Sequence, residues 1–149
     1  MVQFDPKLIV YQILALQSFY YAIMGVFLGS FRALFGIQVG TRLIFSGKLV
    51  SLSTTAGWTT ICCHLLTALS GAILLPVIVE RAKKCLDFTS TLYIIHLGIC
   101  CFYDGVPQNW EWWILQMASL ALMVVLGEYA CSRRELRDIP LFAPLPSQV

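Results

Sequence analysis

The sequence predicts an all-α, polytopic membrane protein, a bundle of four transmembrane helices joined by short loops. The first observation is composition: of 149 residues, 58% are hydrophobic and only 12% are charged, about half the charge of ordinary soluble domains. The second is that four uncharged stretches of 24, 31, 16 and 16 residues interrupt the charged positions. Ten basic and eight acidic residues leave a net charge of +2, which is too little for nucleic-acid binding.

The uncharged stretches define the expected spans. A helix rises 1.5 Å per residue, so about 20 residues cross a hydrocarbon layer about 30 Å thick. The first two stretches are long enough, whereas the last two must borrow flanking residues or sit in a thin bilayer. We expect one domain over 1–149, with spans at about 8–31, 58–79, 86–103 and 112–132 and a cytosolic tail over 133–149.

The basic residues predict that both termini face the cytosol. Seven lie near the N-terminus, between spans two and three, or in the tail, and three lie in the other connections. Lysine and arginine are enriched on the cytosolic side of membrane proteins. At the start of the fourth span, Trp110, Trp112 and Trp113 are an expected aromatic membrane anchor. The first connection, about 32–57, is expected to lie along the lumenal interface.

Gly25 and Gly29 form a GxxxG motif on the first span. This spacing puts two glycines on one helical face, so that another backbone can approach closely. We expect that face to pack within the same chain, with contact to a second copy, a homodimer, as the alternative.

Six cysteines lie in or beside the expected spans. Structural disulfides are not expected, because adjacent cysteines do not readily bridge and the cytosol is reducing. Cys85 and Cys131 stand at cytosolic membrane borders, where palmitoylation is the candidate modification.

The two histidines, His64 and His96, fall at matching depths in spans two and three. The favoured interpretation is a neutral pair that hydrogen-bonds across helices. The alternatives are ligation of a b-type haem in an electron-transfer protein, or a soft-metal site formed by His96 and Cys100 beside Cys62, Cys63 and His64. Because no partners that would orient metal ligands are identifiable, we predict no metal site and no cofactor.

Two carboxylates, Asp87 and Glu128, stand at the cytosolic border. A carboxylate there needs a partner, so each either pairs with a nearby basic residue or recognises another protein. The sequence contains no nucleophile elbow, Walker loop or HExxH motif, and no enzymatic function is predicted.

Several short segments carry a resemblance over residues 5 to about 141. The most specific are Cys85-Leu86-Asp87-Phe88-Thr89, Gly127-Glu128-Tyr129 and Ile139-Pro140-Leu141. The others are Asp5-Pro6, Gln12-Ile13, Tyr20-Tyr21, His96-Leu97, Cys100, Phe102-Tyr103, Trp112-Trp113, Cys131 and Glu135-Leu136. In this order and spacing they resemble the Sys-one family of Golgi integral membrane proteins.

The resemblance implies a non-enzymatic receptor in the trans-Golgi membrane that recruits an Arf-related small GTPase. The N-terminal methionine of that GTPase is acetylated, and its recruitment supports traffic between endosomes and the Golgi. The expected partners are therefore this GTPase and membrane lipids. The candidate partner-binding residues are at the cytosolic ends of the spans: Asp87, Glu128, Tyr129, Arg133, Arg134 and Glu135.

Overall fold

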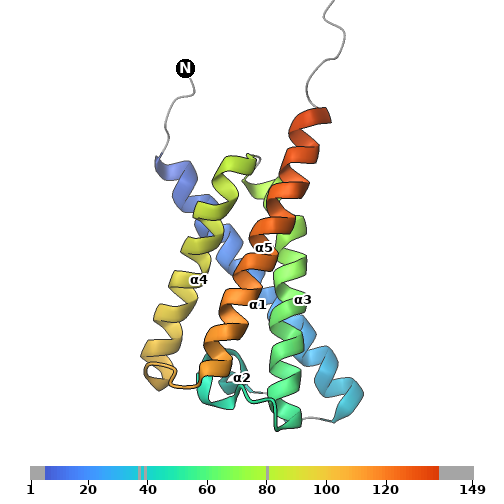
Figure 1. The fold of residues 1–149 in the computed structure, drawn as a ribbon, viewed down its shortest axis with the longest axis vertical. Helices are drawn as coiled ribbons and strands as arrows, with labels where there is room; N and C mark the ends of the chain where they lie inside the picture. The colour runs from blue at the N-terminus through green and yellow to red at the C-terminus, as the bar shows by residue number, and fades with distance from the viewer. Residues whose placement is uncertain (1–5, 37, 39, 80, 138–149) are drawn as a thin grey trace, which may run out of the picture.

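The computed structural model describes residues 6–36, 38, 40–79 and 81–137. Within them the four expected spans are helices α1 (Pro6–Phe35), α3 (Thr55–Ile78), α4 (Ala82–Asp104) and α5 (Trp110–Arg137), as Figure 1 shows. Each helix is long and apolar enough to cross a membrane. The predicted all-helical four-span bundle is confirmed, while Ile139-Pro140-Leu141 lies outside the described residues.

The helices are longer than the uncharged stretches that predicted them. α4 has 23 residues, about 35 Å at 1.5 Å per residue, because it recruits residues 82–87 ahead of the apolar run. At this length α4 can cover a hydrocarbon layer about 30 Å thick. α5 continues through Arg137, so the first five residues of the expected tail are helical.

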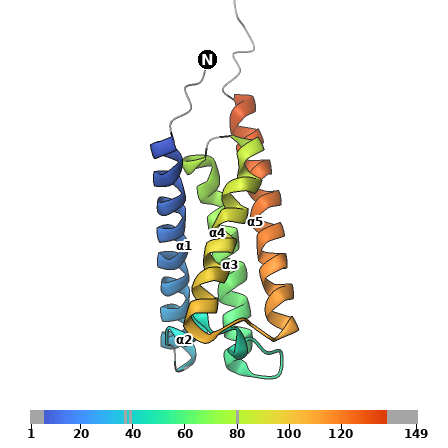
Figure 2. The same cartoon turned by 90° about the vertical axis from the view of Figure 1, so that its left-hand side faces the viewer.

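The two ends of the bundle, named here the terminal end and the loop end, contain different parts of the chain. At the terminal end, α1 begins, α3 ends, α4 begins and α5 ends, so both termini of the described chain lie together (Figure 1). At the loop end lie the other connections (Figure 2). Four antiparallel crossings thus bring the two chain ends to one side.

The first connection folds beneath the bundle at the loop end. It contains a single helical turn, α2 (Arg42–Phe45), and a 3-10 turn, η1 (Gly47–Leu49). Leu43 and Val50 are only 4% and 1% exposed, because their side chains enter the cores at the ends of the long helices. The expected interfacial segment is therefore partly built into the protein interior.

Small residues let α3 and α5 approach closely. A Cβ on Gly71 would lie 2.8 Å from Met123 Cε, and one on Gly127 would overlap Leu75. α3 packs most extensively on α5 and then on α1, whereas α4 packs mainly on α5. α1 contributes a narrow seam of buried residues four apart: Leu16, Tyr20, Met24 and Leu28.

The GxxxG motif of α1 is not used within the chain. No atom lies within 4 Å of the Cβ position of Gly25 or Gly29, and both residues are exposed. The expectation of intramolecular packing is wrong, because the seam that faces the bundle runs through Met24 and Leu28 instead. Contact with a second copy through this open face stays a prediction.

Replacing Gly57 with alanine should destabilise the fold. The Thr54 side chain accepts a hydrogen bond from the Gly57 N–H at 3.1 Å, and a Cβ on Gly57 would overlap the Ser51 backbone. Because backbone atoms cannot rotate away from the added methyl group as a flexible side chain could, we expect Gly57→Ala to lower the free energy of unfolding by about 1–3 kcal/mol. The measurement is the melting temperature in detergent micelles, which should fall. The matched control is Gly98→Ala, whose Cβ meets no atom within 4 Å and should be neutral or stabilising by up to about 1 kcal/mol. Equal melting temperatures for the two variants would contradict the close approach of Ser51 to the first turn of α3.

Candidate functional site

The six candidate partner-binding residues all lie at the terminal end. Asp87 is on the second turn of α4, and the other five are on the last three turns of α5. Asp87, Tyr129, Arg133, Arg134 and Glu135 are exposed, whereas Glu128 is half-buried. The structure therefore brings Asp87 to the same end of the bundle as the five α5 residues, which follow it by 41 or more positions in sequence.

Two of the six hold the helix ends together. Arg134 Nη1 donates a hydrogen bond to the Pro76 carbonyl in the last turn of α3. Glu135 Oε1 accepts a hydrogen bond of 3.0 Å from the Ala82 N–H at the start of α4. Helix ends leave such groups without intrahelical partners, so the last turn of α5 ties down both sides of the α3–α4 turn. A similar bond joins α1 to α3, from Gln12 Nε2 to the Ile78 carbonyl at 2.7 Å.

Three of the six candidate side chains form no bond to another helix in the described part of the chain: Asp87, Tyr129 and Arg133. Arg133 donates to the Tyr129 hydroxyl at 3.0 and 2.7 Å and lies 5.3 Å from the centre of its ring. Asp87 and Glu128 make no ion pair with any described residue, so the expected pairing with a basic neighbour is not found; the ion pair among described residues is Lys48 with Asp104. An exposed aromatic, a guanidinium and an unpaired carboxylate are therefore available to a partner.

Cys85 and Cys131 face each other across α4 and α5. Their Sγ atoms are 3.2 Å apart and both side chains are 0% exposed. All six cysteines are free thiols. Palmitoylation at either position would require α4 and α5 to part first, because neither sulfur reaches the surface.

The two histidines meet in the interior, as their matched depths predict. Their ring centres are 5.9 Å apart and both rings are buried, at 1% and 0% exposed. His96 Nδ1 lies 3.0 Å from the Tyr21 hydroxyl of α1, and His64 Nδ1 lies 2.9 Å from the Thr60 carbonyl in its own helix. One of them therefore forms the predicted cross-helix hydrogen bond, and the other bonds within α3.

The haem alternative finds no support in this arrangement. The rings of Tyr20, Tyr21 and Phe45 surround His96 at centre-to-centre distances of 5.8 to 6.4 Å. These aromatic rings occupy the space that a planar macrocycle would need. In the described part of the chain, no three His, Cys, Asp or Glu side chains are grouped to hold a metal ion.

The tryptophans at the start of α5 divide into two kinds. Trp110 and Trp113 are 65% and 42% exposed, but Trp112 is 2% exposed. Trp110 and Trp113 therefore lie where an interfacial anchor would be. Trp112 instead packs in a small core with Val50, Cys100 and Leu115, on the face of α5 that looks into the bundle.

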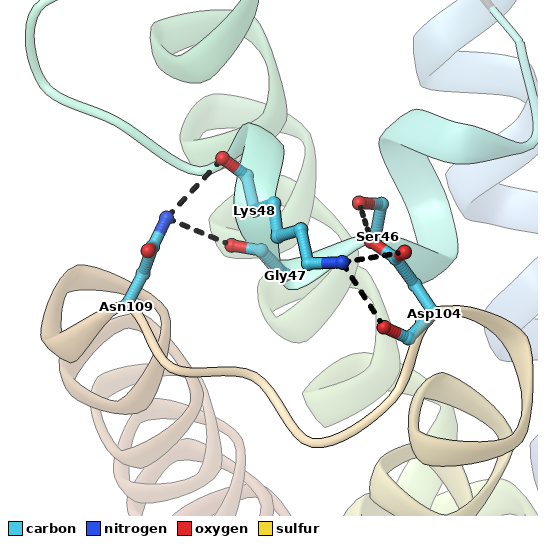
Figure 3. A network of polar contacts seen from close by, with 5 residues as sticks. All are labelled: Ser46, Gly47, Lys48, Asp104 and Asn109. Carbon is cyan, nitrogen blue, oxygen red and sulfur yellow. Dashed lines mark hydrogen bonds and ion pairs between the residues drawn. The ribbon is translucent and has the colours of Figure 1, made fainter.

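A polar network at the loop end was not anticipated from the sequence (Figure 3). Ser46 Oγ donates to Asp104 Oδ2, and Lys48 Nζ lies 2.9 Å from Asp104 Oδ1. The bond from Ser46 and then the bond from Lys48 lower the pKa of the Asp104 carboxyl from its ordinary value. Asn109 Nδ2 donates to the Gly47 and Lys48 carbonyls at 3.3 and 3.2 Å. The network joins the first connection to the α4–α5 turn.

Comparisons with known proteins agree on one family. Residues 1–141 match the family model described as SYS1, an integral membrane protein linking to the trans Golgi network. A SYS1 homolog of Nematostella vectensis is 40% identical over 93% of this chain and 88% of its own length. A Dictyostelium discoideum homolog is 36% identical over 92% of this chain, and the Saccharomyces cerevisiae protein is 30% identical over 90%. The chain spans only 59% and 66% of those two relatives. No solved structure matches the chain significantly.

Oxidation should join Cys85 to Cys131, because a disulfide needs two sulfurs already close and suitably facing. Diamide accepts two electrons and two protons as the thiols form an S–S bond, and is itself reduced to the hydrazine. We expect peptide mapping of the oxidised protein to find a Cys85–Cys131 link. Cys85→Ser should abolish the link and Cys100→Ser, also at a buried thiol, should preserve it. Linkage of Cys131 to any other cysteine would show that α4 and α5 are wrongly paired.

Proposed function

Because the chain belongs to the SYS1 family of integral membrane proteins linked to the trans-Golgi network, we propose that it is a non-enzymatic receptor for a small GTPase. The GTPase is Arf-related and carries an acetylated N-terminus. Its recruitment to the trans-Golgi supports protein transport between the Golgi and endosomes. The receptor surface is the terminal end of the bundle.

The observation that carries this proposal is the make-up of that end. Both termini of the described chain and the α3–α4 turn lie at this end (Figure 1), and the candidate residues belong to the helix turns found there. Arg134 and Glu135 fasten the helix ends and so act as positioning residues. Asp87, Tyr129 and Arg133 are also exposed, but among the described residues their side chains form no bond to another helix, and we assign the partner contact to them. Aromatic and arginine side chains dominate the binding energy of many interfaces.

Charge supports a cytosolic position for this end. Seven basic residues belong to it: Lys7, Arg81, Lys83, Lys84, Arg133, Arg134 and Arg137. The helix ends and connections of the loop end carry three, Arg32, Arg42 and Lys48. By the positive-inside rule, the terminal end faces the cytosol, where a small GTPase is available. Its basic residues also attract anionic lipids, at about 1 kcal/mol each.

Two weak contacts, one to lipid and one to the receptor, explain how the GTPase selects one membrane. An acetylated amphipathic helix without a fatty chain adsorbs to membranes only reversibly. A second contact, to the terminal end of this protein, makes the remaining step intramolecular and raises overall affinity. The GTPase then accumulates only where both the lipid and the receptor are present.

Removing the exposed contact groups should release the GTPase. We expect Asp87→Asn and Tyr129→Ala with Arg133→Ala each to weaken binding by about tenfold or more, as for central interface residues. The measurements are GTPase fluorescence at the Golgi and binding of purified acetylated GTPase to the protein in nanodiscs. Arg32→Ala, at the exposed loop end of α1, is the matched control and should bind normally. If the variants reach the Golgi and still bind the GTPase as tightly as the unmodified protein does, the terminal end is not the receptor surface.

A further inference from the structure

The loop end contains a pocket that the proposed function does not use. It has a volume of about 530 Å³ and is lined by Arg42, Ser46, Lys48, Leu49, Tyr103 and Asp104. This volume is within the range of small-ligand sites, about 300–1,000 Å³. The lining combines two cations, one carboxylate, two hydroxyls and one leucine, so its net charge is positive.

The walls of the pocket are held in place by the network of Figure 3. Both carboxylate oxygens of Asp104 are engaged, one by Ser46 and one by Lys48. The Tyr103 hydroxyl lies 3.2 Å from Thr41 Oγ1. Asn109 fixes the backbone of η1 from the α4–α5 turn. The pocket is therefore formed by the first connection and the end of α4, and the α4–α5 turn supports it from outside.

Arg42 is the group that this network leaves unused. Its guanidinium makes no hydrogen bond or ion pair with the residues that the structure describes, although Arg42 lines the same pocket as Asp104. A guanidinium carries five donors in a planar fork that matches two oxygens of a phosphate. Lys48 Nζ has three donors, and its contacts with Asp104 O and Oδ1 occupy two of them. Two cationic donors thus face the same space with capacity left for an anion.

The position of the pocket along α4 indicates where that anion comes from. The uncharged run of α4 ends at Tyr103 and the pocket begins there. Tyr103 itself is 48% exposed, and Trp110 at the same end is 65% exposed. Exposed tyrosine and tryptophan side chains at the end of a span mark the level of the lipid headgroups. A phosphate held at this level is attached to a lipid.

We propose that this pocket binds the phosphate of a phospholipid headgroup from the leaflet at the loop end. Arg42 binds two phosphate oxygens and Lys48 contributes the remaining donor, while Leu49 contacts the glycerol and the start of the acyl chains. Asp104 keeps Lys48 in place and does not itself contact the phosphate. The bound lipid thereby links the first connection to α4 and to the surrounding membrane.

Native mass spectrometry of the purified protein tests this assignment. The probe is dioleoylphosphatidylglycerol added to delipidated protein in neutral detergent. We expect one lipid to be retained tightly, and Arg42→Gln to reduce its retention about tenfold or more, the size expected for loss of a charge-assisted bidentate contact. Arg32→Gln removes another exposed cation of the loop end, outside the pocket, and should retain the lipid as the unmodified protein does. Circular dichroism should be unchanged in both variants.

Two further arms distinguish the source of the ligand. Dioleoylglycerol, which has the same acyl chains and no phosphate, should not compete for the site, and neither should inorganic phosphate at equal concentration. Equal lipid retention by Arg42→Gln and the unmodified protein, or competition by dioleoylglycerol, would overturn the phosphate assignment. Displacement by inorganic phosphate would overturn the lipid assignment and indicate a soluble anion.

Discussion

The rest of the structure depends on the absence of water inside a bilayer. Backbone N–H and C=O groups there must bond to each other, and a helix achieves this within one segment. Four helices of 23 to 30 residues satisfy this requirement. An even number of antiparallel crossings brings the start of α1 and the end of α5 to the same end. The proposed docking surface requires this shared end.

Different interactions hold the helices together at the two ends of the bundle. At the terminal end, side chains of α5 bond to backbone groups of the α3–α4 turn. At the loop end, an ion pair and an asparagine tie the first connection to α4 and α5. Between them lies an apolar interior that contains the histidine pair and small residues at the α3–α5 contact.

The fold could be predicted from where charges are absent, because hydrocarbon excludes ionised groups strongly. The depth of His64 and His96 followed from the same count. The inward face of each helix could not be predicted, since lipid and protein interior are both apolar. Gly25 and Gly29 were therefore expected inside and lie outside, whereas Trp112 was expected at the interface and is buried.

The candidate site could be predicted only in part. Asp87 and Glu128 were singled out as carboxylates at the membrane border, the other four residues followed from the resemblance, and the common end followed from the number of spans. Arg134 and Glu135 bond to the ends of other helices, whereas the side chains of Asp87 and Tyr129 do not. This difference depends on the rotation of each helix and on how far α5 continues, which composition does not determine. The loop-end network was missed because Lys48 and Asp104 are 56 positions apart and neither belongs to a recognisable motif.

The proposed receptor surface requires both chain ends to lie on the cytosolic face of the Golgi membrane. The most direct measurement attaches an epitope tag to each end and treats intact, sealed Golgi vesicles with protease, using a lumenal protein as the seal control. Both tags should be digested without detergent while the lumenal control survives. Digestion of one tag and protection of the other would contradict it, since the receptor surface would then be divided between two compartments.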